Sequence, residues 1–126
     1  MAYRQTLDYL YTQLPMFHRI GAAAYKADLN NTLAICDLLD HPENKFKSIH
    51  VAGTNGKGSV CAFLDSICRT ASVKVGLYTS PHLISITERV RIDGEDISEK
   101  DFARLSTRVR ETCEQLVSSG DRKSVV

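Results

Sequence analysis

The stretch Ile49–Ser59, Ile-His-Val-Ala-Gly-Thr-Asn-Gly-Lys-Gly-Ser, decides how the rest of this chain can be organised. It begins as an apolar run, breaks into a glycine-rich turn and leaves that turn with Lys57 and Ser59. Glycine accepts a positive φ, so such a turn can bring backbone N–H groups close to a phosphate. A strand, a tight turn and a helix N-terminus in this order make an anion site, because the helix end adds unpaired donors and about half a unit of positive charge.

The turn departs twice from the general nucleotide-loop pattern G-x-x-x-x-G-K-[ST]. Val51 stands in place of the first glycine, and Gly58 separates Lys57 from Ser59. The pattern alone therefore fits a nucleotide loop and an ordinary glycine turn about equally. The flanking segments favour the nucleotide loop, because a strand is predicted over Lys47–Ala52 and a helix over Lys57–Ala71.

A second strand, over Val73–Tyr78, completes a predicted strand–helix–strand unit with a right-handed crossover. The polar segment Thr79–His82 follows that strand. In open α/β sheets ligands bind at the carboxyl edge of the strands, so we expect this segment and the glycine-rich loop to meet there. The predicted fold class is α/β, a truncated parallel sheet with flanking helices. The apolar stripe of the first helix should face that sheet: Val60, Phe63, Leu64, Ile67, Cys68 and Ala71.

The other segments carry local signals. Apolar spacing predicts a helix over Tyr3–Leu14 that Pro15 ends, then a loop over Met16–Lys26. A second helix, capped by Asp28 or Asn30, is predicted to run to about Asp40. Asp93-Gly94 predicts a hairpin within Ile86–Ile97, either simply solvated or serving as a substrate flap. Ser98 to Asp101 begins a last helix in capping-box fashion, with aspartate in place of the usual glutamate.

Size and charge exclude several functions. The chain has 126 residues and a net charge of +1, so it is one domain at most and lacks the strongly basic character of nucleic-acid-binding domains. No apolar run approaches the roughly 20 residues of a membrane span, and the N-terminus lacks a signal-peptide core, so a cytoplasmic location is expected. The four cysteines form no C-x-x-C pair and are interpreted as small apolar core residues.

Three motifs carry a family resemblance. The loop Gly53–Ser59, Gly-Thr-Asn-Gly-Lys-Gly-Ser, resembles the phosphate loop of the folylpolyglutamate synthase and dihydrofolate synthase family, relatives of the Mur ligases, and that family's loop shares both departures. Gly76–Leu83 is similar to the family's second signature, and Glu88–Ile92 to a third. The front end, from Tyr9 to Gly21, also resembles the family. The resemblance extends over about Leu7–Phe102.

The resemblance implies a Mur-ligase-like central domain and an ATP-dependent ligase. ATP would phosphorylate a carboxylate of folate or dihydropteroate, and the amino group of L-glutamate would attack the acyl phosphate to form an amide. By position, Lys57 would be the catalytic residue and phosphate contact, and the other phosphate-binding residues would be Asn55, Gly56, Gly58 and Ser59. Ser59 and Ser80 would bind Mg²⁺. A monomer is implied for the full-length protein, with no membrane partner.

The family's further requirements lie outside this sequence. Two strands cannot make a stable parallel sheet, so residues 1–126 are expected to be the N-terminal part of the ATP-binding domain, without the glutamate-binding domain. The segment 120–126 does not resemble the family and is interpreted as a frayed or foreign tail. Two alternatives stay open: a Mur-type amino-acid ligase, against which Thr79–Leu83 argues, and a non-catalytic nucleotide-binding fragment. His82 is interpreted as a structural loop histidine.

Overall fold

The structure is a computed structural model that describes residues 1–20 and 29–119, without the side chains of residues 13–20. The chain divides into two compact units, one formed by residues 1–47 and 103–126 and the other by residues 48–102. The loop expected over Met16–Lys26 is wrong for residues 16–20, which are helical. Residues 21–26 of that loop, the Asp28 cap and the tail 120–126 lie outside the described residues.

The first unit is helical. It contains α1 (Tyr3–Ile20), α2 (Asn30–Leu38), the short 3₁₀ helix η2 (Pro42–Asn44) and most of α4 (Glu99–Ser118). Residues at the start of α1 contact α4: the N-terminal amine donates to Thr107 Oγ1 at 3.0 Å, and the Arg110 guanidinium lies 4.5 Å from the centre of the Tyr9 ring. A guanidinium over an aromatic face is attractive, so charge as well as apolar burial joins the two helices.

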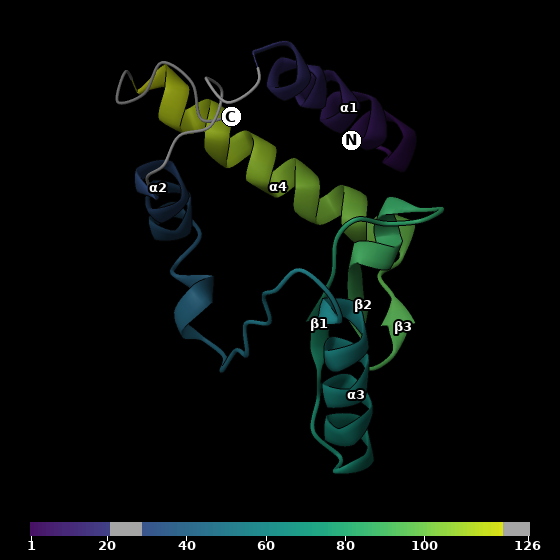
Figure 1. Ribbon diagram of the computed structural model, residues 1–126. Coiled ribbons are helices and arrows are strands. Elements are labelled where there is room, and N and C mark those ends of the chain that lie inside the picture. Colours follow the sequence, from purple (N-terminus) through teal and green to yellow (C-terminus); the bar gives the residue numbers. More distant parts are fainter. Residues whose placement is uncertain (21–28, 120–126) are drawn as a thin grey trace. The chain divides into compact units, whose positions relative to one another are not determined.

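The second unit contains the glycine-rich loop and a small sheet (Figure 1). After α3 (Lys57–Thr70) the chain forms β1 (Gly76–Tyr78), the 3₁₀ helix η3 (Ile86–Arg89), β2 (Val90–Ile92) and β3 (Glu95–Asp96). Both strand pairs are antiparallel, in the order β1-β2-β3, with Leu77 opposite Arg91 and Ile92 opposite Glu95. Helix α3 packs against β1.

The parallel sheet expected from the sequence is wrong for the described residues. Their sheet is antiparallel, and β1 pairs with the hairpin strand β2 instead of with residues 47–52. Residues 47–53 have no regular secondary structure, and the Ile49 side chain is 72% exposed. A strand takes its hydrogen bonds from a neighbour, and no described segment offers this one a partner.

Two helix boundaries also differ from the prediction. Helix α1 continues through Pro15 to Ile20. A proline removes one backbone hydrogen bond, and a helix can bend or kink at that point without ending there. In α2 the N-cap residue is Leu29, which makes no side-chain cap bond, and Asn30 is already helical. The cap predicted at Asn30 is therefore wrong.

The local turn signals are confirmed. Asp93 and Gly94 adopt φ values of 50° and 86° between β2 and β3, the two positive values that a type I′ hairpin needs. Ser98 Oγ accepts the Asp101 backbone N–H at 3.0 Å and so caps α4. Helix α3 ends in a Schellman motif around Ser72, whose φ is 61°.

The apolar stripe predicted for α3 is largely uncovered. Val60 is 45% exposed, Phe63 66% and Ile67 64%, whereas Leu64 and Cys68 are half-buried. The described cysteines are all free and half-buried: Cys36, Cys61, Cys68 and Cys113. Among the helices that the structure describes, none combines the length and apolar character needed to cross a bilayer.

Candidate functional site

The glycine-rich loop leads into α3 through a left-handed residue. Gly56 is the N-cap residue, with φ 81°, and Gly53 has φ 152°, both values that side chains disfavour. The helix ladder begins with the Val60 N–H, which donates to the Gly56 carbonyl at 3.0 Å. The N–H groups of Lys57, Gly58 and Ser59 precede that bond and have no partner within the helix. No side chain caps this end, and its first turn holds no acidic residue.

Lys57 and Gly58 complete the anion site. The Lys57 ammonium is exposed and donates to the Gly53 carbonyl, so it lies back over the loop. A Cβ built on Gly58 would meet nothing within 4 Å, and the same is true at Gly56. The fold therefore leaves open space over the backbone at Gly58, although its φ does not demand glycine. Unpaired donors, positive charge and open space together suit a phosphate.

Ser80 lies in a second loop of the same unit, just after β1. The Thr79 N–H donates to the Arg89 carbonyl at 2.9 Å, which fixes the start of this loop. The Ser80 and Ser59 side chains are both exposed. Within the described residues, no hydrogen bond or ion pair joins this loop to the glycine-rich loop, so their expected convergence stays a prediction.

The donors present fit a phosphate-bound Mg²⁺ better than a metal held by protein alone. No group of three or more His, Cys, Asp or Glu side chains that could hold a metal occurs among the described residues. Ser59 and Ser80 offer neutral hydroxyl oxygens, which are hard ligands of the kind Mg²⁺ accepts beside phosphate oxygens. The assignment of both serines stays a prediction.

His82 takes part in a structural contact. Its Nδ1 accepts a hydrogen bond from Arg89 Nε at 2.7 Å, and the ring is half-buried. This bond fixes the tautomer with the proton on Nε2 when the ring is neutral. The contact supports the interpretation of His82 as a loop histidine.

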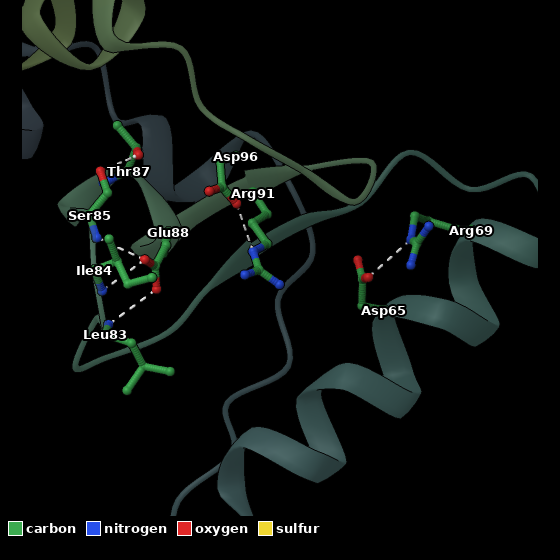
Figure 2. Close-up of polar contacts among 9 residues, drawn as sticks. All are labelled: Asp65, Arg69, Leu83, Ile84, Ser85, Thr87, Glu88, Arg91 and Asp96. Carbon is green, nitrogen blue, oxygen red and sulfur yellow. Dashed lines mark hydrogen bonds and ion pairs between the residues drawn. The ribbon is translucent and has the colours of Figure 1, made fainter.

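Glu88 is an organising residue that the sequence interpretation missed. Its carboxylate accepts backbone N–H groups from Leu83, Ile84 and Ser85, at 3.1, 2.9 and 2.7 Å (Figure 2). Those bonds, with the bond to Ser85 the strongest influence, hold the pKa of the Glu88 carboxyl below its usual range. The signal was available, because Ser85-Ile86-Thr87-Glu88 is an S-x-x-E capping box.

A partly buried ion pair joins two residues of α3. Arg69 Nε donates to Asp65 Oδ2 at 3.0 Å, and the Asp65 side chain is only 9% exposed (Figure 2). The other carboxylate oxygen, Oδ1, is buried and has no partner among the described residues. An unpaired buried oxygen costs free energy, so this pair, which lies within α3, carries a residual penalty.

The fold and the loop first define a class of protein: an α/β unit whose helix N-terminus follows a glycine N-cap, has no side-chain cap and suits a phosphate. Comparison with known proteins narrows this class to a family. No family model matches the chain. A folylpolyglutamate synthase of Arabidopsis thaliana is 57% identical over 67 residues, covering 52% of this chain and 12% of the relative. One of Saccharomyces cerevisiae is 34% identical over 132 aligned positions, covering 95% of this chain and 24% of the relative.

Solved structures agree. A folylpolyglutamate synthetase from Lactobacillus casei matches with a TM-score of 0.80 and 30% identity, covering 96% of this chain and 28% of that one. A Mycobacterium tuberculosis folylpolyglutamate synthase complexed with ADP and AMPPCP matches with a TM-score of 0.79 and 27% identity, covering 98% and 26%. The chain is therefore homologous to the folylpolyglutamate synthase and dihydrofolate synthase family. It spans roughly a tenth to just over a quarter of the length of these relatives.

Proposed function

We propose that this chain is the nucleotide-binding part of an ATP-dependent ligase that joins L-glutamate to a carboxylate of folate or dihydropteroate. The observation that carries the proposal is the N-terminus of α3, where three backbone N–H groups lack helix partners and a Cβ on Gly58 would enter open space. The homology supports the same assignment, because solved relatives are described as complexes with ADP, AMPPCP and folate.

In this proposal the loop binds the phosphates of ATP. The backbone N–H groups at Gly58 and Ser59 donate to phosphate oxygens, and Lys57 leaves the Gly53 carbonyl to neutralise charge on them. Mg²⁺ supplies further neutralisation of the phosphates when bound, with Ser59 and Ser80 as its protein ligands. Asn55 and Gly56 shape the turn that precedes these donors.

The reaction class follows from the homology. Transfer of the γ-phosphoryl group to a carboxylate gives an acyl phosphate and ADP. The amino group of L-glutamate then displaces phosphate and forms the amide. We further propose that residues 1–126 form the first part of a Mur-ligase-like ATP-binding domain in a cytoplasmic monomer, and that other parts of the ligase hold glutamate.

Calorimetric titration of MgATP into the chain tests the nucleotide part. The proposal expects saturable binding that weakens about tenfold or more in Lys57→Ala, because a phosphate-bound ammonium makes a charge-assisted bond. Lys74→Ala is the matched control: Lys74 is an exposed lysine of the same unit, and its removal should leave the affinity within about twofold. Absence of binding by the unaltered chain, or equal affinity of both variants, would contradict the proposal.

Substrate choice is tested on a ligase that contains this sequence. ADP release that depends on both L-glutamate and dihydropteroate or tetrahydrofolate supports the folate assignment. ADP release only with a cell-wall peptide precursor would support a Mur-type ligase instead.

A further inference from the structure

The loop from Ser80 to Glu88 is held by one carboxylate. Glu88 Oε1 accepts the N–H groups of Ile84 at 2.9 Å and Ser85 at 2.7 Å, and Oε2 accepts that of Leu83 at 3.1 Å (Figure 2). Hydrogen bonds to an ionised acceptor are stronger than neutral ones, so a single side chain fixes three successive peptide groups.

Two further bonds fix the ends of this loop. The Thr79 N–H donates to the Arg89 carbonyl at 2.9 Å, and Arg89 Nε donates to His82 Nδ1 at 2.7 Å. Ser80 therefore lies between two anchored residues, Thr79 and His82. Every anchor originates from Glu88 or Arg89, which are neighbours on η3.

Apolar burial does not hold the middle of the loop. Leu83 and Ile84 are each 92% exposed, so their side chains gain almost nothing from the hydrophobic effect in this unit. Next to Glu88 the Thr87 residue is buried, at 7% exposed, and its hydroxyl lies 2.7 Å from Ser85 Oγ. The conformation of residues 83–85 thus depends on the carboxylate.

We propose that Glu88 is a positioning residue that holds the loop carrying Ser80 in a ligand-ready conformation before Mg²⁺ and nucleotide arrive. The role of Ser80 in this proposal rests on the proposed function, whereas the action of Glu88 on residues 83–85 does not. The bond from the Ser85 N–H is also part of a capping box, so the same carboxylate closes the first turn of η3.

The charge of Glu88 gives this arrangement a defined pH dependence. Its backbone hydrogen bonds, the bond from Ser85 foremost, lower the pKa of the carboxyl from its ordinary value of 4.5. A depressed folded-state pKa means that the stabilisation is present above the unfolded pKa and is lost as the pH falls through the folded pKa. His82, the ionisable group that acts on Glu88 across the loop, lowers the same pKa when it is charged.

The other charged groups near η3 belong to strands that pack against it. Strand β2 carries Arg91 and strand β3 carries Glu95 and Asp96. Arg91 Nε is paired with Asp96 Oδ1 at 2.9 Å, so these two charges largely cancel (Figure 2). Glu95 is exposed and makes a matched control.

Amide NMR of the chain tests the action of Glu88 directly. In the unaltered chain the amide protons of residues 83–85 should shift together with a midpoint below pH 4.5 and exchange slowly above it. Glu88→Gln keeps the shape of the side chain but replaces one acceptor oxygen by a donor. The common titration should disappear, and protection should fall about tenfold or more at one or more of these amides.

Glu95→Gln should reproduce the unaltered chain. Retention of slow exchange at residues 83–85 in Glu88→Gln and in Glu88→Ala would overturn the proposal. If Glu88→Ala loses all tertiary amide dispersion, that variant is unfolded. The isosteric variant Glu88→Gln then decides between the two outcomes.

A second measurement tests whether the loop positions Ser80. Calorimetry of nucleotide binding with and without Mg²⁺ should show that Glu88→Gln reduces the Mg²⁺-dependent gain in affinity several-fold and leaves Mg²⁺-free binding unchanged. An unchanged Mg²⁺-dependent gain would show that Glu88 is structural only and would overturn the positioning role. If the unaltered chain binds no nucleotide, the proposed function fails, while the NMR titration still reports on Glu88.

Discussion

The guanidinium of Arg69, on α3, fills the space that a side chain on Gly94 would need. A Cβ built on Gly94 would lie 2.7 Å from Arg69 Nη1 and 2.9 Å from its Cζ, and Gly94 has a φ of +86°. The hairpin turn can therefore approach the end of α3 closely because Gly94 has no side chain. The same guanidinium is also paired with Asp65, because Arg69 Nε lies 3.0 Å from Asp65 Oδ2.

Gly94→Ala should destabilise the chain by about 1–3 kcal/mol, because the new methyl group meets the guanidinium and a non-glycine residue is strained at this φ. The measurement is the free energy of unfolding in urea. The partly exposed arginine can move aside, so the lower part of that range is expected if the steric term relaxes. Unchanged stability would show that the turn and the helix are not in register as described.

Gly58→Ala should have the opposite profile. Its Cβ meets nothing within 4 Å and its position is helical, so stability should stay equal or rise by up to about 1 kcal/mol. Nucleotide affinity should nevertheless fall, because the methyl group enters the space proposed for phosphate. Urea unfolding and calorimetry on the same protein sample separate the two effects, and intact affinity would argue against phosphate at this point.

Arg69→Met should cost about 1–3 kcal/mol, because it leaves the buried Asp65 carboxylate with neither oxygen paired. The expected loss in the free energy of unfolding is modest because the Arg69 side chain is 42% exposed and solvent screens the pair. The double variant Asp65→Leu, Arg69→Met should recover part of the loss. A double-mutant cycle from urea unfolding measures the coupling, and strictly additive effects would show that the pair contributes nothing.

Ser59→Ala and Ser80→Ala should each weaken the Mg²⁺ dependence of nucleotide binding, since each removes one oxygen ligand. Both side chains are exposed, so neither change should alter unfolding in urea measurably. Calorimetry across a Mg²⁺ series checks both. Identical series for both variants and the unaltered chain would remove both serines from the metal site; if only one variant responds, we expect it to be Ser59→Ala.

The chain alone should be marginally stable and should show no ligase turnover. The stripe of Val60, Phe63 and Ile67 on α3 is 45–66% exposed, so apolar area that would contribute about 25 cal/mol per Å² stays in water. Typical domains have a free energy of unfolding of only about 5–15 kcal/mol, so the burial energy that these three exposed side chains do not contribute is a substantial fraction of it. Urea unfolding with an ADP-release assay measures both properties. A steep transition of ordinary domain stability, or glutamate-dependent ADP release, would refute the corresponding expectation.

Several signals confined to a few residues predicted the structure well, although the helix stop at Pro15 and the cap at Asn30 were wrong. The Asp93-Gly94 turn, the Ser98 cap and the start of a helix at Lys57 each depend on bonds within one or two turns of chain, and all three are confirmed. The same kind of signal, a capping box, marked Glu88, but the sequence interpretation placed this residue in the hairpin over Ile86–Ile97. In the structure Ile86–Arg89 form η3 before the first hairpin strand begins at Val90.

Long-range pairing could not be predicted in this way. The apolar run at Lys47–Ala52 is compatible with a strand, but a strand exists only where a neighbour donates and accepts hydrogen bonds. The real partner of residues 76–78 is β2, which the periodicity of the sequence does not specify. The side-chain contact between Arg69 and the Gly94 turn is similarly invisible, because it joins residues 25 apart through the absence of a Cβ.

The loop around Ser80 has a consequence for the order in which the protein assembles. Its bonds join close neighbours in sequence: Glu88 bonds to residues three to five positions earlier, and Arg89 to residues seven and ten positions earlier. Closing a loop of about ten residues takes roughly 10–100 ns. A ribosome adds only about 5–20 residues per second, so this loop can adopt its shape as soon as Arg89 has emerged. The segment proposed to bind Mg²⁺ would then be an early template on which later-synthesised residues of this chain assemble.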